Sequence, residues 1–466
     1  MRFPPLCCCA LIAPLLWSGC VVGPDYEKPV TSVAATYEHP IPGPAGMEKT
    51  ALPKEAWWTV FKDPVLDRLE QEATAASPTI RAAVARRDQA WALARVDRSA
   101  LFPQATVSAG GERSRVSDRL RASTRPSVST TISLPVDLSY EVDLWGRVRR
   151  TLESGVARAE ASEADYRQIL LGVQADVARA YFSLRALDEE RELLRQTVES
   201  RGRALEIVRR RFELGAGNDF EVSVAETERA SAEGDLLAVE QERTAVRHAL
   251  AVLTGRLPES FALELTEPSP RAVPAIPVGL PSELLERRPD VAAAERTLAS
   301  VHAQIGVALA AYFPSIRLVG SGGYASDELG SLLSWGNREW SFAPSISLPL
   351  FTGGRNRANE ARARALYDEA AANYRQQVLV AFQEVETALS DLARLAERGR
   401  VLDRAVASSR RAADLVGVRY RAGRIGYLDV TDAERTAIGN QRLAVQVRAL
   451  QFAASVTLVK ALGGGW

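Results

Sequence analysis

The sequence predicts a mixed α and β membrane protein made of two internal structural repeats, each combining β-strands with a very long α-helix. Three observations predict this fold class. One pattern of residues recurs at a fixed offset, a long segment carries apolar residues at coiled-coil spacing, and other segments alternate apolar and polar residues over about ten positions.

Composition excludes several classes of protein. The 466 residues carry 58 basic and 58 acidic side chains, and this balance argues against a nucleic-acid partner, which would favour a basic excess. The histidines are far apart, and no Cys or His pair has metal-ligand spacing, so we expect no metal and no cofactor. No nucleophile elbow, phosphate loop or other convergent catalytic set is found, and we expect no enzyme.

The first residues have the features of an export signal. Arg2 precedes the apolar stretch Leu6–Leu16, and small residues lead to Cys20. All four cysteines lie within these 20 residues. The ending resembles a bacterial lipobox, which predicts a lipoprotein signal peptide at 1–19, lipid attachment at Cys20 and a lipidated N-terminal segment at 20–59. The alternative is an ordinary secretory signal. The rest of the chain contains no run of 18 apolar residues, so no transmembrane helix is predicted there.

An internal repeat organises the rest of the chain. Tyr166-Arg167-Gln168 recurs as Tyr374-Arg375-Gln376, and Gly215 recurs as Gly423, both at an offset of 208 residues. Upstream matches drift to 211 and 214, which places insertions in the intervening loops. We therefore predict repeat 1 at 60–255, a Pro-rich linker at 256–280 and repeat 2 at 281–466, each with the order helix, two strands, long helix, helix.

The long helices are predicted at about 147–214 and about 354–421. In the first, the apolar residues from Leu152 to Phe212 keep one coiled-coil register, with Glu163, Arg191 and Arg201 as exceptions. Such a helix is about 100 Å long. A solitary rod is one interpretation. Abundant alanine, which allows packing on more than one flank, favours a cylinder wall.

The strands are predicted at about 104–113, 128–141, 315–324 and 340–351. In the second and fourth, apolar residues alternate with mostly polar or small ones. This pattern is typical of outer-membrane barrel strands, although a half-buried sheet in a soluble sandwich would share it. Four strands cannot close a barrel, and open sheet edges are not tolerated in hydrocarbon, so several chains must contribute. Three copies would give twelve strands, but this arithmetic leaves two or four copies open.

Two motifs carry a resemblance to a known family. The segment Cys20–Pro29 and the stretch Asp143-Leu144-Trp145-Gly146-Arg147 resemble the TolC-like outer-membrane factor family, in particular its lipoprotein (NodT-type) branch, which serves resistance-nodulation-division efflux systems. The resemblance covers essentially the whole mature chain and both repeats.

That resemblance implies a homotrimer in which a 12-stranded outer-membrane β-barrel, with four strands per chain, continues as a long periplasmic α-helical coiled-coil barrel. It implies a lipid-anchored protein of the bacterial outer membrane that contacts outer-membrane lipid, a periplasmic adaptor (membrane fusion) protein and an inner-membrane resistance-nodulation-division transporter. The expected function is the exit channel of a tripartite efflux pump, passively conducting drugs or other small solutes. The alternatives are the duct of a type I protein secretion system and a periplasmic coiled-coil lipoprotein without a channel.

Glycines mark the turns that join the long helices to the helices after them. Gly215 and Gly217 lie in the first turn, and Gly423 and Gly426 lie in the second. Tight reversals need a positive φ, which glycine adopts without strain. In the resembled family these tips form the closed periplasmic entrance and contact the adaptor.

The second turn is followed by two carboxylates, Asp429 and Asp432, on one face of the next helix. In a trimer they would become six carboxylates around one axis, resembling the aspartate constriction of the family, and such a ring attracts cations. Arg421 and Arg424 are candidates for salt links that keep this gate closed. The simpler alternative is an acidic helix N-terminus stabilised by the helix dipole.

Overall fold

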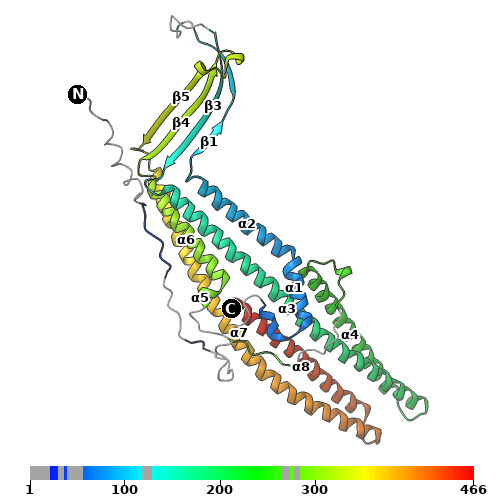
Figure 1. The fold of residues 1–466 in the computed structure, drawn as a ribbon. Coiled ribbons are helices and arrows are strands. Elements are labelled where there is room, and N and C mark those ends of the chain that lie inside the picture. The colour runs from blue at the N-terminus through cyan, green and yellow to red at the C-terminus, as the bar shows by residue number, and fades with distance from the viewer. Residues whose placement is uncertain are drawn as a thin grey trace. The chain divides into compact units, whose positions relative to one another are not determined.

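The computed structural model describes residues 21–29, 36–38, 56–117, 119, 128–263, 272–277 and 284–465 (Figure 1). The predicted signal peptide and Cys20 lie outside these residues. The chain forms two compact units. Unit 1 comprises Met1–Val30, Arg86–Glu163 and Ala293–Arg375, and unit 2 comprises Thr31–Ala85, Ala164–Ala292 and Gln376–Trp466.

Helices and strands follow one another in the same order twice. The elements of the first half are η3 (Trp57–Phe61), α1 (Pro64–Ala76), α2 (Pro78–Ser99), β1 (Gln104–Val107), β2 (Gly110–Arg115), β3 (Val128–Val142), α3 (Arg147–Glu213), α4 (Asp219–Leu253) and η4 (Pro258–Ser260). Those of the second half are α5 (Leu284–Arg287), α6 (Pro289–Ala310), β4 (Ser315–Ser326), η6 (Leu329–Ser331), η7 (Trp335–Asn337), β5 (Arg338–Ser347), α7 (Arg355–Arg421) and α8 (Tyr427–Ala461).

The repeat is visible in the helix boundaries. From α3 to α7 both ends shift by the same number of residues, 355 − 147 = 208 and 421 − 213 = 208, and α4 and α8 have the same offset at both ends. The pair α2 and α6 is offset by 289 − 78 = 211 at its start and 310 − 99 = 211 at its end. Both values equal the offsets of the sequence matches, so the duplicated residues occupy equivalent structural positions.

Unit 1 contains one antiparallel sheet with the strand order β1-β3-β4-β5, in which β2 also pairs with β3. The strand predicted at about 104–113 is therefore two strands, which is a correction. Both strands pair with β3 in one continuous register, because Val107 pairs with Val136 and, three residues further along each strand, Gly110 pairs with Ser133. Pro135, which has no N–H, lies opposite the gap and interrupts the ladder. β1 and β2 thus fill a single position in the sheet.

The strand predicted at about 340–351 is β5, which begins two residues earlier and ends at Ser347. The chain leaves the sheet before Pro349, a residue that cannot donate to a ladder. This end is the second correction to the strand bounds.

The strand register separates the residues of the sheet into two faces. Apolar residues of β3 share a face with apolar residues of β5, with glycines of β4 between them. Val136 pairs with Gly322, which pairs with Trp340, and Leu138 pairs with Gly320, which pairs with Phe342. Trp340 is 83% exposed and Phe342 is 63% exposed. The other face carries mostly polar or small residues, among them Ser133, Asp137, Ser139, Ser321, Ser341 and Ser345. One face is therefore apolar and uncovered within this chain.

The strand-to-helix junction of unit 1 is a packed cluster. Trp145 stacks on Phe313 with ring centroids 4.8 Å apart, and its indole N–H donates to the Pro314 carbonyl at 2.7 Å. The Asp143 carboxylate accepts from the backbone N–H groups of Val148 and Arg149, which satisfies free donors at the start of α3. The direction in which α3 leaves the sheet is fixed by these contacts.

Unit 2 has a hydrophobic core built from α1, α3, α4, α7 and α8. Phe182 stacks on Phe452 at 4.5 Å, and both contact Phe61. The Tyr181 hydroxyl donates to Asp63, the N-cap of α1, at 2.6 Å. These contacts join both repeats in one core. Among the helices of the described segments, none combines the length and the apolar run needed to cross a membrane.

Candidate functional site

The two helix tips of unit 2 end in the same backbone motif. Gly215 has φ 71° and Gly423 has φ 70°. In each tip the glycine N–H donates three residues back, to Phe212 or Tyr420, and the next N–H donates five residues back, to Arg211 or Arg419. This is a Schellman motif, which satisfies the last helix carbonyls and requires a left-handed residue. Both glycines are therefore structurally required at the tips.

The other two predicted tip glycines have different roles. A Cβ on Gly217 would lie 3.2 Å from the Phe212 backbone nitrogen, so Gly217 is in close contact with the end of α3. Gly426 is the N-cap of α8 with φ −82°, a value that any residue adopts. At the corresponding place in the first tip, Asn218 caps α4 by accepting from the Glu221 N–H at 2.9 Å.

The predicted gate carboxylates are both exposed at the start of α8. The Gly426 N–H donates to Asp429 Oδ2 at 3.1 Å, so Asp429 caps the helix, as the simpler alternative expects. Asp432 lies one turn further along and has no ion pair within the described chain. One carboxylate thus has a local structural role, whereas the other has no partner that explains it.

The predicted basic partners are exposed as well. Arg421 is the last residue of α7 and Arg424 lies in the turn. Within the residues that the structure describes, neither forms a salt bridge with Asp429 or Asp432. A link between these charges therefore has to join different copies of the chain if it exists.

A different contact joins the two tips. Arg211 Nη1 donates to the Tyr420 hydroxyl at 2.8 Å, and its guanidinium lies 5.5 Å from the centre of the Tyr420 ring. Arg211 also donates to the Ala216 carbonyl in its own turn. The ends of α3 and α7 consequently lie side by side at the same level.

Sequence reasoning missed a buried ionic cluster above the tips. Arg201 on α3 is buried, and its Nη1 lies 3.3 Å from Glu228 Oε2 on α4 and 3.4 Å from Glu434 Oε2 on α8. Glu228 also pairs with Arg435. The available signal was Arg201 itself, an arginine at an apolar position of the α3 coiled-coil register. Its partners lie on other helices and could not be read from that register.

The cluster borders a groove of about 860 Å³ between α3, α7 and α8, which Tyr427 also lines. Burial raises the pKa of the Glu434 carboxyl, and the nearby Arg201 partly offsets this effect. Burial likewise raises the pKa of the Tyr427 hydroxyl. The groove is thus lined by a fixed arginine and by groups that burial biases toward their neutral forms.

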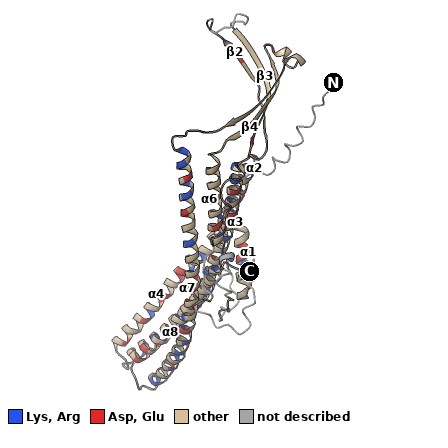
Figure 2. Cartoon of the chain, turned by 90° about the vertical axis from the view of Figure 1, so that its left-hand side faces the viewer, with Lys and Arg blue, Asp and Glu red and all other residues tan. Residues whose placement is uncertain are grey.

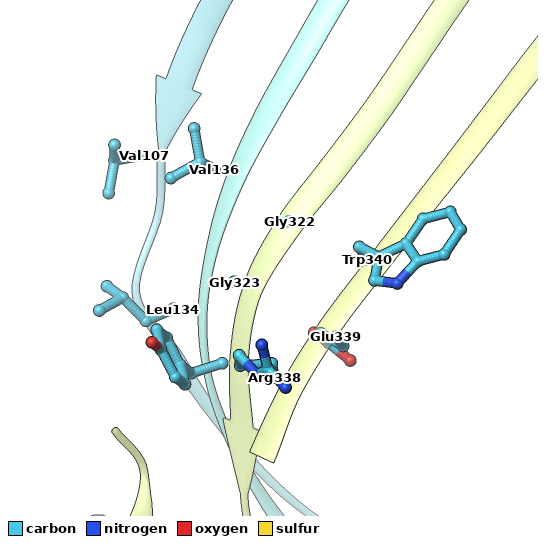
Figure 3. Close-up of a pocket in the computed structure, with 9 residues that line it drawn as sticks. Val107, Leu134, Val136, Gly322, Gly323, Arg338, Glu339 and Trp340 are labelled. Atoms are coloured by element: carbon cyan, nitrogen blue, oxygen red, sulfur yellow. The ribbon is translucent and has the colours of Figure 1, made fainter. Parts of the chain in front are cut away.

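In unit 1 the apolar face of the sheet contains a shallow hollow of about 580 Å³ (Figure 3). Val107, Leu134 and Val136 approach it from one side and Trp340 from the other. Gly322, which lies between Val136 and Trp340, has no side chain to fill the space between them, and Arg338 and Glu339 also line the hollow. No group of three or more His, Cys, Asp or Glu side chains able to hold a metal ion is present among the described residues.

Lipid attachment at Cys20 lies outside the described residues, but the next residues are packed in unit 1. The Val22 N–H donates to the Trp145 carbonyl at 3.0 Å, and the Asp25 carboxylate lies 2.8 Å from Arg150. The Tyr26 hydroxyl donates to Glu295 at 2.7 Å. The segment after Cys20 therefore starts at the strand-to-helix junction.

Comparison with known proteins identifies the family. Residues 69–256 and 280–464 match the family described as outer membrane efflux protein. The chain belongs to this family. It is 33% identical to outer membrane protein OprJ of Pseudomonas aeruginosa, over 100% of this chain and 97% of the relative, and 31% identical to the toluene efflux pump outer membrane protein TtgC of Pseudomonas putida, over 98% and 94%. The solved structure of the outer-membrane channel OprN superposes with a TM-score of 0.85 at 33% identity, covering 96% of this chain and 100% of that chain.

Membership in the outer membrane efflux protein family gives the described features a common setting. The expected mixed α and β fold is confirmed, and so are the expectations of an outer-membrane protein, of efflux transport and of a channel. The apolar sheet face of unit 1 is the part of the chain that suits a lipid environment. The helix tips of unit 2 are the turns at the C-terminal ends of the long helices α3 and α7.

Proposed function

We propose that this efflux protein is the exit channel of a tripartite pump, in which it passively conducts drugs or other small solutes from an adaptor and a transporter to the cell exterior. The observation that carries the proposal is the sheet of unit 1, which has one uncovered apolar face, one polar face and two open edges. Apolar side chains toward lipid and polar ones toward a lumen are what a water-filled barrel requires.

The open edges support a homotrimer. β5 forms one edge, and β1 with β2 forms the other, so backbone groups on both sides need partners. One chain supplies four strand positions, because β1 and β2 share one. Three chains then give a 12-stranded barrel, an even number within the range of bacterial outer-membrane barrels.

We propose the helix tips as the periplasmic gate and adaptor-contact region. The turns around Gly215 and Gly423 follow the two longest helices of the described residues, and the first turn lies next to the second through Arg211 and Tyr420. A periplasmic adaptor protein bound here would connect the channel to an inner-membrane resistance-nodulation-division transporter. TtgC is named for toluene efflux, and cargo of this small, apolar kind is one class that such a pump would carry.

Lipid attachment at Cys20 agrees with the position of the following residues. Val21 contacts Gly146 at the strand-to-helix junction, which is the end of the apolar sheet and hence the expected edge of the lipid layer. A lipid on Cys20 could reach the periplasmic leaflet from there. Cys20→Ser should abolish incorporation of labelled palmitate while leaving the protein in the outer membrane, and labelling that persists would refute this attachment site.

Complementation tests the function directly. A strain that lacks this chain but retains its adaptor and transporter should accumulate a fluorescent efflux substrate, and the wild-type chain should reduce this accumulation. The matched control is a chain carrying Leu134→Arg, which puts a charge on the apolar sheet face. Unchanged accumulation despite normal wild-type protein in the outer membrane would refute the proposal, and a secretion defect for a large protein instead would favour the type I duct.

A further inference from the structure

The apolar face of the sheet in unit 1 ends in a row of paired residues that contains an arginine. The row of this face beside the start of α3 consists of Val142, Ile316 and Ile346. Arg338 pairs with Tyr324, which pairs with Leu134, and this row lies 142 − 134 = 8 residues further along β3. Eight residues span about 26 Å along a strand, or about 20 Å of height at the usual tilt of barrel strands. Since the apolar band of such barrels is about 25 Å tall, Arg338 lies close to its border.

The charges beyond this border are basic on the apolar face. Charged residues are sparse in the strands and frequent in the helices (Figure 2). Arg113 pairs with Thr130 and Arg115 pairs with Val128, which puts both arginines on the apolar face, further from the helices than Arg338. We call Arg338, Arg113 and Arg115 the basic rim. The acidic neighbours belong to the other face, because Glu112 pairs with Thr131 and Glu339 pairs with Gly323.

Arg338 is held in position but keeps free donors. Its guanidinium carbon lies 3.0 Å from the centre of the Trp335 ring, and its Nε donates to the Trp335 carbonyl at 2.7 Å. Its two terminal nitrogens form no hydrogen bond or ion pair within the residues that the structure describes. Arginine binds a phosphate group through two parallel N–H donors, so a positioned guanidinium with free terminal nitrogens suits a phosphate.

The hollow on the apolar face lies directly beside Arg338 (Figure 3). Its floor is Gly322, and its sides are Val136 on β3 and Trp340 on β5, two strand spacings or about 10 Å apart. A Cβ on Gly322 would meet no atom within 4 Å, whereas a Cβ on Gly323 would lie 2.3 Å from the Leu134 carbonyl oxygen. Gly323 is thus needed for strand pairing, but Gly322 leaves a gap wide enough for one hydrocarbon chain.

We propose that the hollow and the basic rim bind a phosphorylated, acylated glycolipid of the outer leaflet, with an acyl chain over Gly322 and a phosphate on Arg338. The inference rests on the proposed function, which orients the sheet so that Arg338 lies on the exterior side. An apolar gap bordered by a basic rim complements a lipid that carries anionic groups next to its acyl chains.

The spread of the basic rim favours a glycolipid over a glycerophospholipid. Arg113 lies four residues beyond the row of Arg338, about 13 Å along the strands, and three strand spacings or about 14 Å across the sheet. A single glycerol phosphate covers only one of these positions. A sugar headgroup with several phosphates extends over both.

Lipid titration of the purified, delipidated trimer tests the headgroup contact. Native mass spectrometry would measure the binding of lipid A that carries its phosphates and of the same lipid after dephosphorylation. The wild type should bind the phosphorylated form more tightly. Arg338→Gln should weaken this binding about tenfold, because the charge-assisted bonds to phosphate are lost. The matched control is Arg317→Gln, which removes an arginine from the polar face of the same sheet and should leave lipid binding unchanged.

Filling the hollow tests the acyl contact. Gly322→Leu should weaken binding of phosphorylated lipid A about tenfold, which corresponds to the burial of roughly two methylene groups. The matched control is Gly330→Leu, since a Cβ on Gly330 also meets no atom within 4 Å and this residue lies outside the hollow. If Gly322→Leu does not assemble, Arg338→Gln and the dephosphorylated lipid decide the question.

The outcomes separate this inference from the proposed function. A conducting trimer that binds both forms of lipid A equally, or whose Arg338→Gln variant binds like the wild type, would overturn the lipid site and leave the channel intact. Displacement of lipid A by inorganic phosphate alone would reveal a simple anion site, which also overturns the proposal. A chain that never forms a trimer would overturn both.

Discussion

Two neighbouring residues of β3 face opposite sides of the sheet. Leu134 pairs with Tyr324 on the apolar face, and Ser133 pairs with Ala325 on the other. If the apolar face meets lipid, Leu134→Arg should lower the free energy of unfolding by about 2 to 4 kcal/mol near the bilayer midplane, whereas Ser133→Arg should have a small effect. Reversible unfolding in phospholipid vesicles would measure both, and equal losses would contradict the assignment of the faces.

The carboxylates at the start of α8 make a prediction about ions. If Asp429 and Asp432 of several copies surround one axis, a trivalent cation added from the periplasmic side should block the current, and Asp429→Asn with Asp432→Asn should relieve that block about tenfold or more. Asparagine keeps the acceptor that Asp429 offers to the Gly426 N–H, so the cap survives. The control is Asp219→Asn at the start of α4. Equal block in the double variant and the wild type would leave Asp429 with its capping role alone.

At the scale of elements, local signals located the helices well because each end is determined by nearby residues. The long helices are observed at 147–213 and 355–421, against expectations of about 147–214 and 354–421. Both helices end shortly before Gly215 and Gly423, where the chain needs a positive φ. The predicted strand bounds were less accurate. The break between β1 and β2 depends on Pro135 lying opposite them in β3, and the pairing of strands is not a local property of the sequence.

The candidate site was only partly readable from the sequence. Asp429 and the tip glycines follow from local patterns, whereas the cluster of Arg201, Glu228 and Glu434 joins α3 and α4 to α8, which belongs to the other repeat. Ion pairs of this kind depend on how helices pack. An isolated arginine in an apolar register indicates that a carboxylate is needed, but not which one.

That cluster carries a prediction at the same scale. Arg201→Ala should destabilise the protein by about 3 kcal/mol, because it leaves buried carboxylates without their arginine. This loss of stability should be at the low end of the range for broken buried ion pairs, since Glu228 keeps its ion pair with Arg435 and Glu434 is partly exposed. Arg203→Ala, an exposed position on the same helix, should change stability by less than about 0.5 kcal/mol. Similar denaturant midpoints for the two variants would show that the cluster contributes no net stability.

At the scale of the whole molecule, duplication accounts for the design. Each repeat supplies part of one sheet and one pair of long helices, and both halves share the core of unit 2. A single copy leaves two sheet edges without partners. Repetition of the chain around an axis would pair these edges with one another.

Conductance of the purified protein in a planar lipid bilayer tests the central claim that copies of this chain form a water-filled channel. Protein shown by native mass spectrometry to be three times the mass of one mature chain should give discrete current steps on insertion. The same preparation carrying Leu134→Arg should insert rarely. Current that stays at baseline although the trimer has inserted, or steps produced by a monomer, would contradict the account.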